Sequence, residues 1–217
     1  DIAIKGKFNG IILQKGIAEK YYQGKIPLIL KLNGKTKFLK GDPLSTQLCT
    51  VKEAIDLGAK VVGYTIYVGS CHEQKMFQEF EKIQREAHKN KLPVIAWMYP
   101  RGKAIKHETS KKNLAYAARI GLELGADIIK TRYSGTINSF EWVIKSAGKV
   151  QVLVAGGSKK TSKNVLQEVF EVMQAGAKGM AIGRNIWQHE YPLKMTKAVK
   201  DIIFNNKTVQ DAIKRLK

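Results

Sequence analysis

The sequence predicts an α/β fold, a (β/α)8 barrel, from three observations. Short apolar segments alternate with helical patterns along all 217 residues. The connections are short, which is typical of parallel strands joined by right-handed crossovers. No Gly-x-Gly-x-x-Gly follows the first strand, which disfavours the dinucleotide-binding form of an open, doubly wound sheet. We therefore expect a closed barrel with its active site at the carboxyl ends of the strands.

Seven short apolar runs are the expected strands, because strands buried on both faces are nearly continuous in apolar residues. They are Gly10–Leu13, Leu28–Leu32, Val61–Ile66, Pro93–Trp97, Asp127–Lys130, Val150–Val154 and Met180–Ile182.

Helical periodicity fills the intervals between these runs. The expected helices are Thr50–Leu57, Glu73–Lys89, Lys111–Leu124, Ile137–Ala147, Lys163–Gln174 and Leu193–Phe204. Gly58, Gly125, Gly148 and Gly176 stand where four of them end. Glycine accepts the left-handed conformation there at no steric cost.

Seven strands are one short of a barrel. Ile2–Lys7 resembles the tail of a helix whose preceding strand is missing, and the chain starts on Asp1 without a methionine. We expect the native protein to be longer and residues 1–217 to form a single barrel domain. The loop from Asn33 to Leu48 is long, so we expect it to shape the substrate mouth.

The charge balance of 38 Lys and Arg against 18 Asp and Glu gives +20, which attracts anions. The lysines are dispersed, with no basic run and no aromatic ladder, so we expect phosphorylated substrates and no dedicated nucleic-acid partner. Two isolated cysteines indicate a reducing, cytoplasmic setting. No apolar run is long enough to cross a membrane.

Lys130 is the strongest candidate for chemistry. It ends a short buried run, and Arg132 follows two positions later. Burial and a neighbouring cation both lower the pKa of a lysine and turn it into an amine nucleophile, as in Schiff-base enzymes. The alternative is a lysine that extends its ammonium to solvent at a strand end.

Trp97, Tyr99 and Arg101 alternate along one strand and are expected to share a face. A phenol can exchange protons, an indole offers an apolar wall, and a guanidinium binds phosphate. An aromatic lid with a solvated arginine is the alternative.

Two glycine-containing turns follow the last two expected strands. Gly156 and Gly157 follow one strand, and Gly183 and Arg184 follow the other. Such turns often build a phosphate site in a barrel, although ordinary strand–helix turns would look the same. The four histidines have no metal-ligand spacing, so we expect no metal and no cofactor.

Taken together, these segments resemble the archaeal-type class I fructose-1,6-bisphosphate aldolases, a Schiff-base (β/α)8 family. The motifs are GIAEKYY, PLILKLNGKT, YTIY, YPRG, the Lys130 strand, AGG and IGRNIWQ. The resemblance implies a metal-independent lyase of glycolysis and gluconeogenesis, with Lys130 as the Schiff-base lysine and Tyr99 as proton donor. It places Trp97 and Arg101 in the substrate pocket, with Gly156, Gly157, Gly183 and Arg184 around a phosphate. It also implies a homo-oligomer, a decamer in the family.

A sister family, 2-amino-3,7-dideoxy-heptulosonate synthase, shares the lysine, YPRG and both glycine turns. Trp97, KLNGKT and GYTIY favour the aldolase. Both families carry an aspartate followed by His-Gly on their first strand, and this sequence has none, so we expect that residue in the missing segment. A non-enzymatic phosphate-binding or nucleic-acid-binding protein is the alternative from another class.

Overall fold

The computed structural model describes residues 1–36, 38 and 40–216. Its centre is a parallel sheet of seven strands in the order β1-β2-β5-β6-β7-β8-β9. These strands correspond to the seven predicted from the sequence, and all their pairings are parallel. They are β1 (Ile11–Gln14), β2 (Leu28–Lys31), β5 (Val61–Val68), β6 (Val94–Pro100), β7 (Ile128–Thr131), β8 (Gln151–Ala155) and β9 (Gly179–Ala181).

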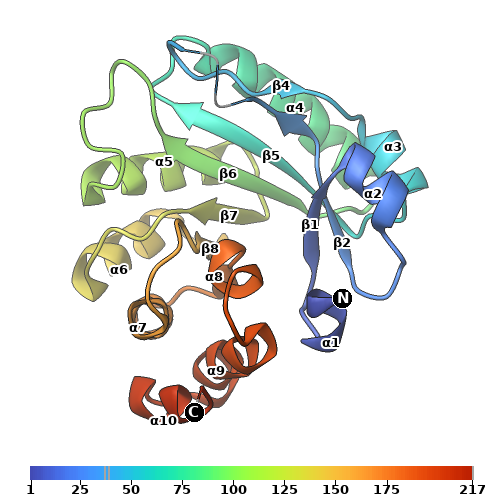
Figure 1. Ribbon diagram of the computed structural model, residues 1–217. Coiled ribbons are helices and arrows are strands. Elements are labelled where there is room, and N and C mark those ends of the chain that lie inside the picture. Colours follow the sequence, from blue (N-terminus) through green and yellow to red (C-terminus); the bar gives the residue numbers. More distant parts are fainter. Residues whose placement is uncertain (37, 39, 217) are drawn as a thin grey trace.

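Helices connect the strands and cover the outer side of the curled sheet (Figure 1). The six predicted helices are present, and the N-terminal helical tail is also confirmed. They are α1 (Ile2–Lys5), α3 (Val51–Asp56), α4 (Glu73–Lys89), α5 (Lys111–Glu123), α6 (Ile137–Ser146), α7 (Ser162–Gln174) and α9 (Pro192–Asn205). The four glycines at helix ends have positive φ angles of 60 to 95°, as their positions predicted.

Five short elements were not predicted. They are α2 (Lys15–Tyr21), β3 (Asn33–Gly34), β4 (Thr46–Gln47), α8 (Arg184–Trp187) and α10 (Val209–Lys214). Segments of two to seven residues are too short for hydrophobic periodicity to reveal. The helix α2 also lacks a side-chain N-cap, so it has no start signal in the sequence.

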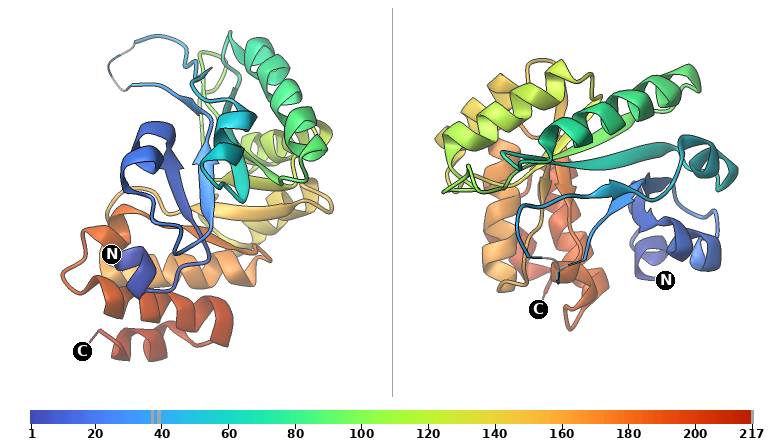
Figure 2. Two further views of the ribbon diagram at one scale, coloured as in Figure 1. Left: turned by 90° about the vertical axis from the view of Figure 1, so that its right-hand side faces the viewer. Right: turned by 90° about the horizontal axis from the view of Figure 1, so that it is seen from above.

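The sheet curls like a barrel wall but has two free edges. Within the described residues β1 and β9 stand at the ends of the strand order and do not pair with each other. Figure 2 shows the curled arrangement from the side and from above. The predicted eighth strand is not among the elements that the structure describes.

The loop that follows β2 is anchored by one buried amide. Asn33 Nδ2 donates to the carbonyl oxygens of Ser45 (3.0 Å) and Thr65 (2.9 Å), and Asn33 Oδ1 accepts from the Thr65 backbone N–H at 2.8 Å. The side chain thus ties both ends of the predicted mouth loop to β5. Residues 37 and 39 of this loop lie outside the described residues. No described helix is long and apolar enough to span a membrane.

Candidate active site

Lys130 lies on β7 with its side chain buried in the interior of the curled sheet. Its Nζ donates a hydrogen bond to the Tyr99 hydroxyl at 2.8 Å. In the pairing of β6 with β7, Trp97 stands directly beside Lys130. The rings of Trp97 and Tyr99 each have their centroid 5.5 Å from the Lys130 ammonium. The structure therefore brings together the lysine, the phenol and the indole that the sequence singled out.

Burial lowers the pKa of Lys130 to about 7, with smaller contributions from the positive charges of Lys31 and Arg132. The two aromatic faces favour a cation and act in the opposite direction, but the loss of hydration is the larger effect. At its ordinary pKa only about one lysine in 2,500 is neutral at pH 7, whereas about half of the Lys130 side chains are neutral there. Lys130 is only 9% exposed. The alternative from the sequence, a lysine that extends its ammonium into solvent, is therefore wrong.

Lys31 is a second lysine on a strand of the sheet that sequence reasoning missed. It is half-buried and ends β2, and loss of hydration lowers its pKa to about 8. Its Nζ donates to the backbone oxygen and to Oδ1 of Asn33. The available signal in the sequence was a lysine inside the apolar run Leu28–Leu32.

Trp97 depends on a glycine of the neighbouring strand. A Cβ atom on Gly63 would lie 1.8 Å from Cζ3 of the indole, far inside van der Waals contact. The indole occupies the space over β5 that a side chain at position 63 would fill. Trp97 is 3% exposed and reaches its position beside Lys130 only because residue 63 has no side chain.

Arg101 is committed to an ion pair. Its Nε and Nη2 donate to the two carboxylate oxygens of Glu108 at 2.6 and 2.7 Å, and Arg132 Nη1 donates to the same carboxylate at 2.9 Å. The hydrogen bond from Arg101 lowers the pKa of Glu108. The two guanidinium groups lie 5.9 Å from the ring centroids of Tyr67 and Tyr99, respectively. Tyr67 and Tyr99 line the cavity that holds Lys130, whereas Arg101, which contacts the Tyr67 ring, does not line it.

The glycine turns after β8 and β9 are joined to each other by hydrogen bonds. Arg184 Nη2 donates to the Gly157 oxygen at 2.9 Å, and Asn185 Nδ2 donates to the oxygens of Gly156 (2.7 Å) and Ser158 (3.0 Å). Asn185 is buried and was not predicted. Gly157 and Arg184 line a hollow of about 870 Å³ that also contains Arg132 and Lys160, whereas Gly183 lines the Lys130 cavity.

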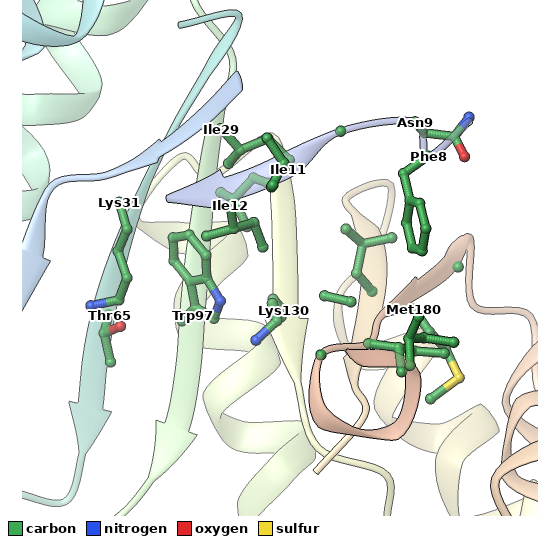
Figure 3. A pocket seen from close by; sticks show the side chains of 18 of the residues that line it. Phe8, Asn9, Ile11, Ile12, Ile29, Lys31, Thr65, Trp97, Lys130 and Met180 are labelled. Carbon is green, nitrogen blue, oxygen red and sulfur yellow. The ribbon is translucent and has the colours of Figure 1, made fainter. Parts of the chain in front are cut away.

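The Lys130 cavity has a volume of about 1170 Å³ and runs between the two free edges of the sheet. Figure 3 shows Lys31, Trp97, Lys130 and Met180 in this order across the cavity wall, with Ile12 of β1 above Trp97. Parts of the loop after β2, including Gly34, also line it. A cavity of this size accommodates a small phosphorylated ligand.

Among the described residues, no group of three His, Cys, Asp or Glu side chains is close enough to hold a metal ion. Two of the four histidines make other side-chain contacts. His88 Nε2 lies 2.8 Å from Asp127 Oδ2, and His189 Nε2 lies 2.9 Å from Ser162 Oγ.

Comparison with known proteins identifies the family. The family model for DeoC/LacD family aldolases matches residues 1–189. The chain belongs to the DeoC/LacD aldolase family. It is 50% identical over 207 residues to a fructose-bisphosphate aldolase class 1 from Thermoproteus tenax, covering 95% of this chain and 79% of the relative. It is 38% identical over 219 residues to the protein of the same name from Halobacterium salinarum, covering 100% of this chain and 83% of the relative.

A solved structure from this aldolase family has the same fold. It is an archaeal fructose-1,6-bisphosphate aldolase with its catalytic lysine covalently bound to the carbinolamine intermediate of the substrate. The TM-score is 0.91 at 50% identity, over 93% of this chain and 81% of that one. The predicted barrel class is therefore confirmed, with seven of its strands among the described residues.

The Gly63–Trp97 packing predicts a specific coupling. Gly63→Ala should lower the free energy of unfolding by about 1–3 kcal/mol, because the new methyl group overlaps the indole. The same substitution in a Trp97→Leu background should cost much less. Chemical denaturation of the four proteins in this cycle measures the coupling, and an equal cost in both backgrounds would contradict it. Gly16→Ala is the matched control, since nothing lies within 4 Å of its Cβ position.

The buried amine predicts a pH-dependent stability. Between pH 7 and 10.5 the unfolded chain holds a proton on Lys130 that the folded chain releases, so this group makes stability rise with pH. Lys130→Met removes the effect. Below pH 7 the free energy of unfolding of the variant should exceed that of the wild type by a few kcal/mol, because the lysine pKa is depressed in the folded state. The difference should vanish near pH 10.5. Urea titrations across this range measure it, and a constant difference at all pH values would show that Lys130 titrates normally.

Proposed function

We propose that this protein is a class I fructose-1,6-bisphosphate aldolase that forms a Schiff base through Lys130. The observation that carries the proposal is the buried amine of Lys130, hydrogen-bonded to Tyr99 at 2.8 Å and with its pKa lowered to about 7. A neutral amine is the nucleophile that attacks a ketone, and burial supplies it near neutral pH. The test is cleavage of fructose 1,6-bisphosphate to dihydroxyacetone phosphate and glyceraldehyde 3-phosphate.

The reaction begins with addition of the Lys130 amine to the C2 ketone, which gives a carbinolamine. Loss of water, with a proton supplied to the departing oxygen, leaves an iminium. The C3–C4 bond then breaks as the C4 hydroxyl loses its proton. The bonding electrons move through C3 to the iminium nitrogen, which gives an enamine and releases the aldehyde. Protonation at C3 and hydrolysis complete the cycle, with the iminium as electron sink.

Tyr99 is the proposed proton donor for loss of water. Its hydroxyl is the hydrogen-bond partner of the Lys130 amine, so it lies within reach of an oxygen that leaves the same centre. Burial raises the pKa of Tyr99, which keeps the phenol protonated. The faces of Trp97 and Tyr99 that flank the ammonium would also stabilise the positive charge of the iminium formed there.

The glycine turns after β8 and β9 are the proposed site for the phosphate on C1. Gly157 and Arg184 line one hollow together with Arg132 and Lys160. Arg132 pairs with Glu108 and Lys160 with Glu168, so Arg184 is the cation here without a carboxylate partner among the described residues. The guanidinium of Arg184 donates one hydrogen bond to the Gly157 oxygen, and its other donors can serve a phosphate. Gly156 and Gly183 belong to the same two turns, and Gly183 lines the Lys130 cavity.

The relatives support this assignment, since the two closely matched curated proteins carry the name fructose-bisphosphate aldolase class 1. The catalytic lysine of the archaeal structure forms a carbinolamine, the first intermediate written above. The packed Gly63–Trp97 pair favours the aldolase over the heptulosonate synthase alternative, because both residues belong to motifs typical of the aldolase. We further propose a cytoplasmic homo-oligomer, in line with two cysteines that are both free thiols.

Borohydride trapping with dihydroxyacetone phosphate should add one triose phosphate mass to the peptide that contains Lys130. Lys130→Met should abolish both labelling and cleavage, while the circular dichroism spectrum stays unchanged. Lys149→Met, which removes an exposed lysine before β8, is the control and should label normally. Labelling of another lysine in active wild-type protein would refute the assignment.

Arg184→Ala should raise KM for fructose 1,6-bisphosphate about 10- to 150-fold, because a charge-assisted hydrogen bond contributes roughly 1.5–3 kcal/mol. The melting temperature should change little, since Arg184 is exposed. Arg119→Ala, an exposed arginine on α5 in an ion pair with Glu123, controls for the loss of one positive charge. Equal KM values in Arg184→Ala and wild type would move the phosphate elsewhere.

A further inference from the structure

Lys31 is a half-buried cation with neutral partners. Its hydrogen bonds go to the backbone oxygen and the side-chain oxygen of Asn33, and within the described residues it forms no ion pair with a carboxylate. An ammonium group taken out of water is costly unless an opposite charge faces it. Lys31 also lines the cavity that contains Lys130. Its charge is therefore available to an anion that enters the cavity.

A second polar group on the same wall lacks a partner. Ser45 Oγ is buried, and among the buried side-chain nitrogen and oxygen atoms of the described residues it is the one without a hydrogen-bond partner. Ser45 lines the cavity, and its backbone oxygen accepts from the Asn33 amide that also accepts from Lys31. Asn33 is fully buried and fixed to Thr65, so it holds Lys31 and Ser45 on one rigid wall. Buried hydroxyl groups nearly always have a partner, which a ligand would supply here.

The strand order places this wall opposite the glycine turns. In the sequence β2-β5-β6-β7-β8-β9, Lys130 on β7 lies between Lys31 on β2 and the turns that follow β8 and β9. Neighbouring strands are about 4.8 Å apart, so the backbones of β2 and β7 are separated by roughly 14 Å along the curved sheet. Both lysines line the same cavity, and Trp97 lies between them (Figure 3). An extended six-carbon sugar with a phosphate at each end matches this layout when its C2 atom is at Lys130.

Arg101, the guanidinium predicted to bind phosphate, pairs with Glu108. Its Nε and Nη2 both donate to the Glu108 carboxylate, and Arg101 does not line the cavity. Lys31 does line the cavity, and the buried side-chain amide of Asn33 fixes its position.

We propose that Lys31 and Ser45 form a second phosphate subsite, which binds the C6 phosphate of fructose 1,6-bisphosphate and the phosphate of the released aldehyde. The subsite rests on the proposed aldolase function and assigns the second half of the substrate, for which the glycine turns offer no place. Lys31 supplies the charge, Ser45 a hydroxyl donor, and Asn33 is a positioning residue that orients both.

Two substrates that differ by one phosphate test the subsite. Lys31→Met should lower kcat/KM for fructose 1,6-bisphosphate about 10- to 150-fold relative to kcat/KM for fructose 1-phosphate, which lacks the C6 phosphate. Removing Lys31 also raises the pKa of Lys130, but this effect is common to both substrates and cancels in the ratio. Ser45→Ala should lower the same ratio about 2- to 12-fold. Lys60→Met removes an exposed lysine that directly precedes β5 and should leave the ratio unchanged.

An unchanged ratio in Lys31→Met would overturn the subsite while leaving the aldolase function standing. Cleavage of neither substrate by the wild type would instead refute the proposed function. Titration with inorganic phosphate, followed by calorimetry, then decides the subsite independently of turnover. The wild type should bind two phosphate ions, Arg184→Ala one, and the double variant Arg184→Ala/Lys31→Met none. Retention of the remaining ion in the double variant would also overturn the proposal.

Discussion

The withdrawal of one amine from water is the constraint on which the site depends. Lys130 sits on a strand of a curled parallel sheet, and its side chain is 9% exposed at the wall of the inner cavity. Burial is the largest influence on its pKa, ahead of either neighbouring cation. The elements around it follow from that placement. Tyr99 accepts the amine's hydrogen bond, and Trp97 closes the space beside it where water would otherwise restore the ordinary pKa.

Much of this arrangement was predictable from residues that are local in the sequence. The seven strands are apolar runs bounded by glycine and polar residues, and side-chain alternation puts Trp97 and Tyr99 on one face. What could not be predicted depends on contacts between distant segments. Arg101 has the same alternation as Tyr99, yet it pairs with Glu108 in a loop seven residues later, and no pattern in the sequence specifies that loop's path. Asn185 and Asn33 likewise gain their importance only from the carbonyl groups that the fold brings to them.

Lys31 is the instructive case, because its sequence context is close to that of Lys130. Lys130 ends its apolar run and Lys31 is the last residue but one of its own, and both have a depressed pKa in the structure. The difference lies in their surroundings. Lys130 meets a phenol and an indole, which leave the amine free to react, whereas Lys31 is held by the oxygens of Asn33, which favour its charged form. Two lysines with a similar sequence context thus become an amine and an ammonium within one cavity.

The overlap between residue 63 and the Trp97 indole also restricts how this sequence can change over evolutionary time. The two positions are 34 residues apart in the chain but share one volume, so substitutions there are not independent. A lineage that lost the indole first could later accept a side chain at position 63 without harm. The reverse order passes through an intermediate in which both groups compete for the same space. Divergence at this wall of the cavity therefore has a preferred direction, set by the steric bulk of a single ring.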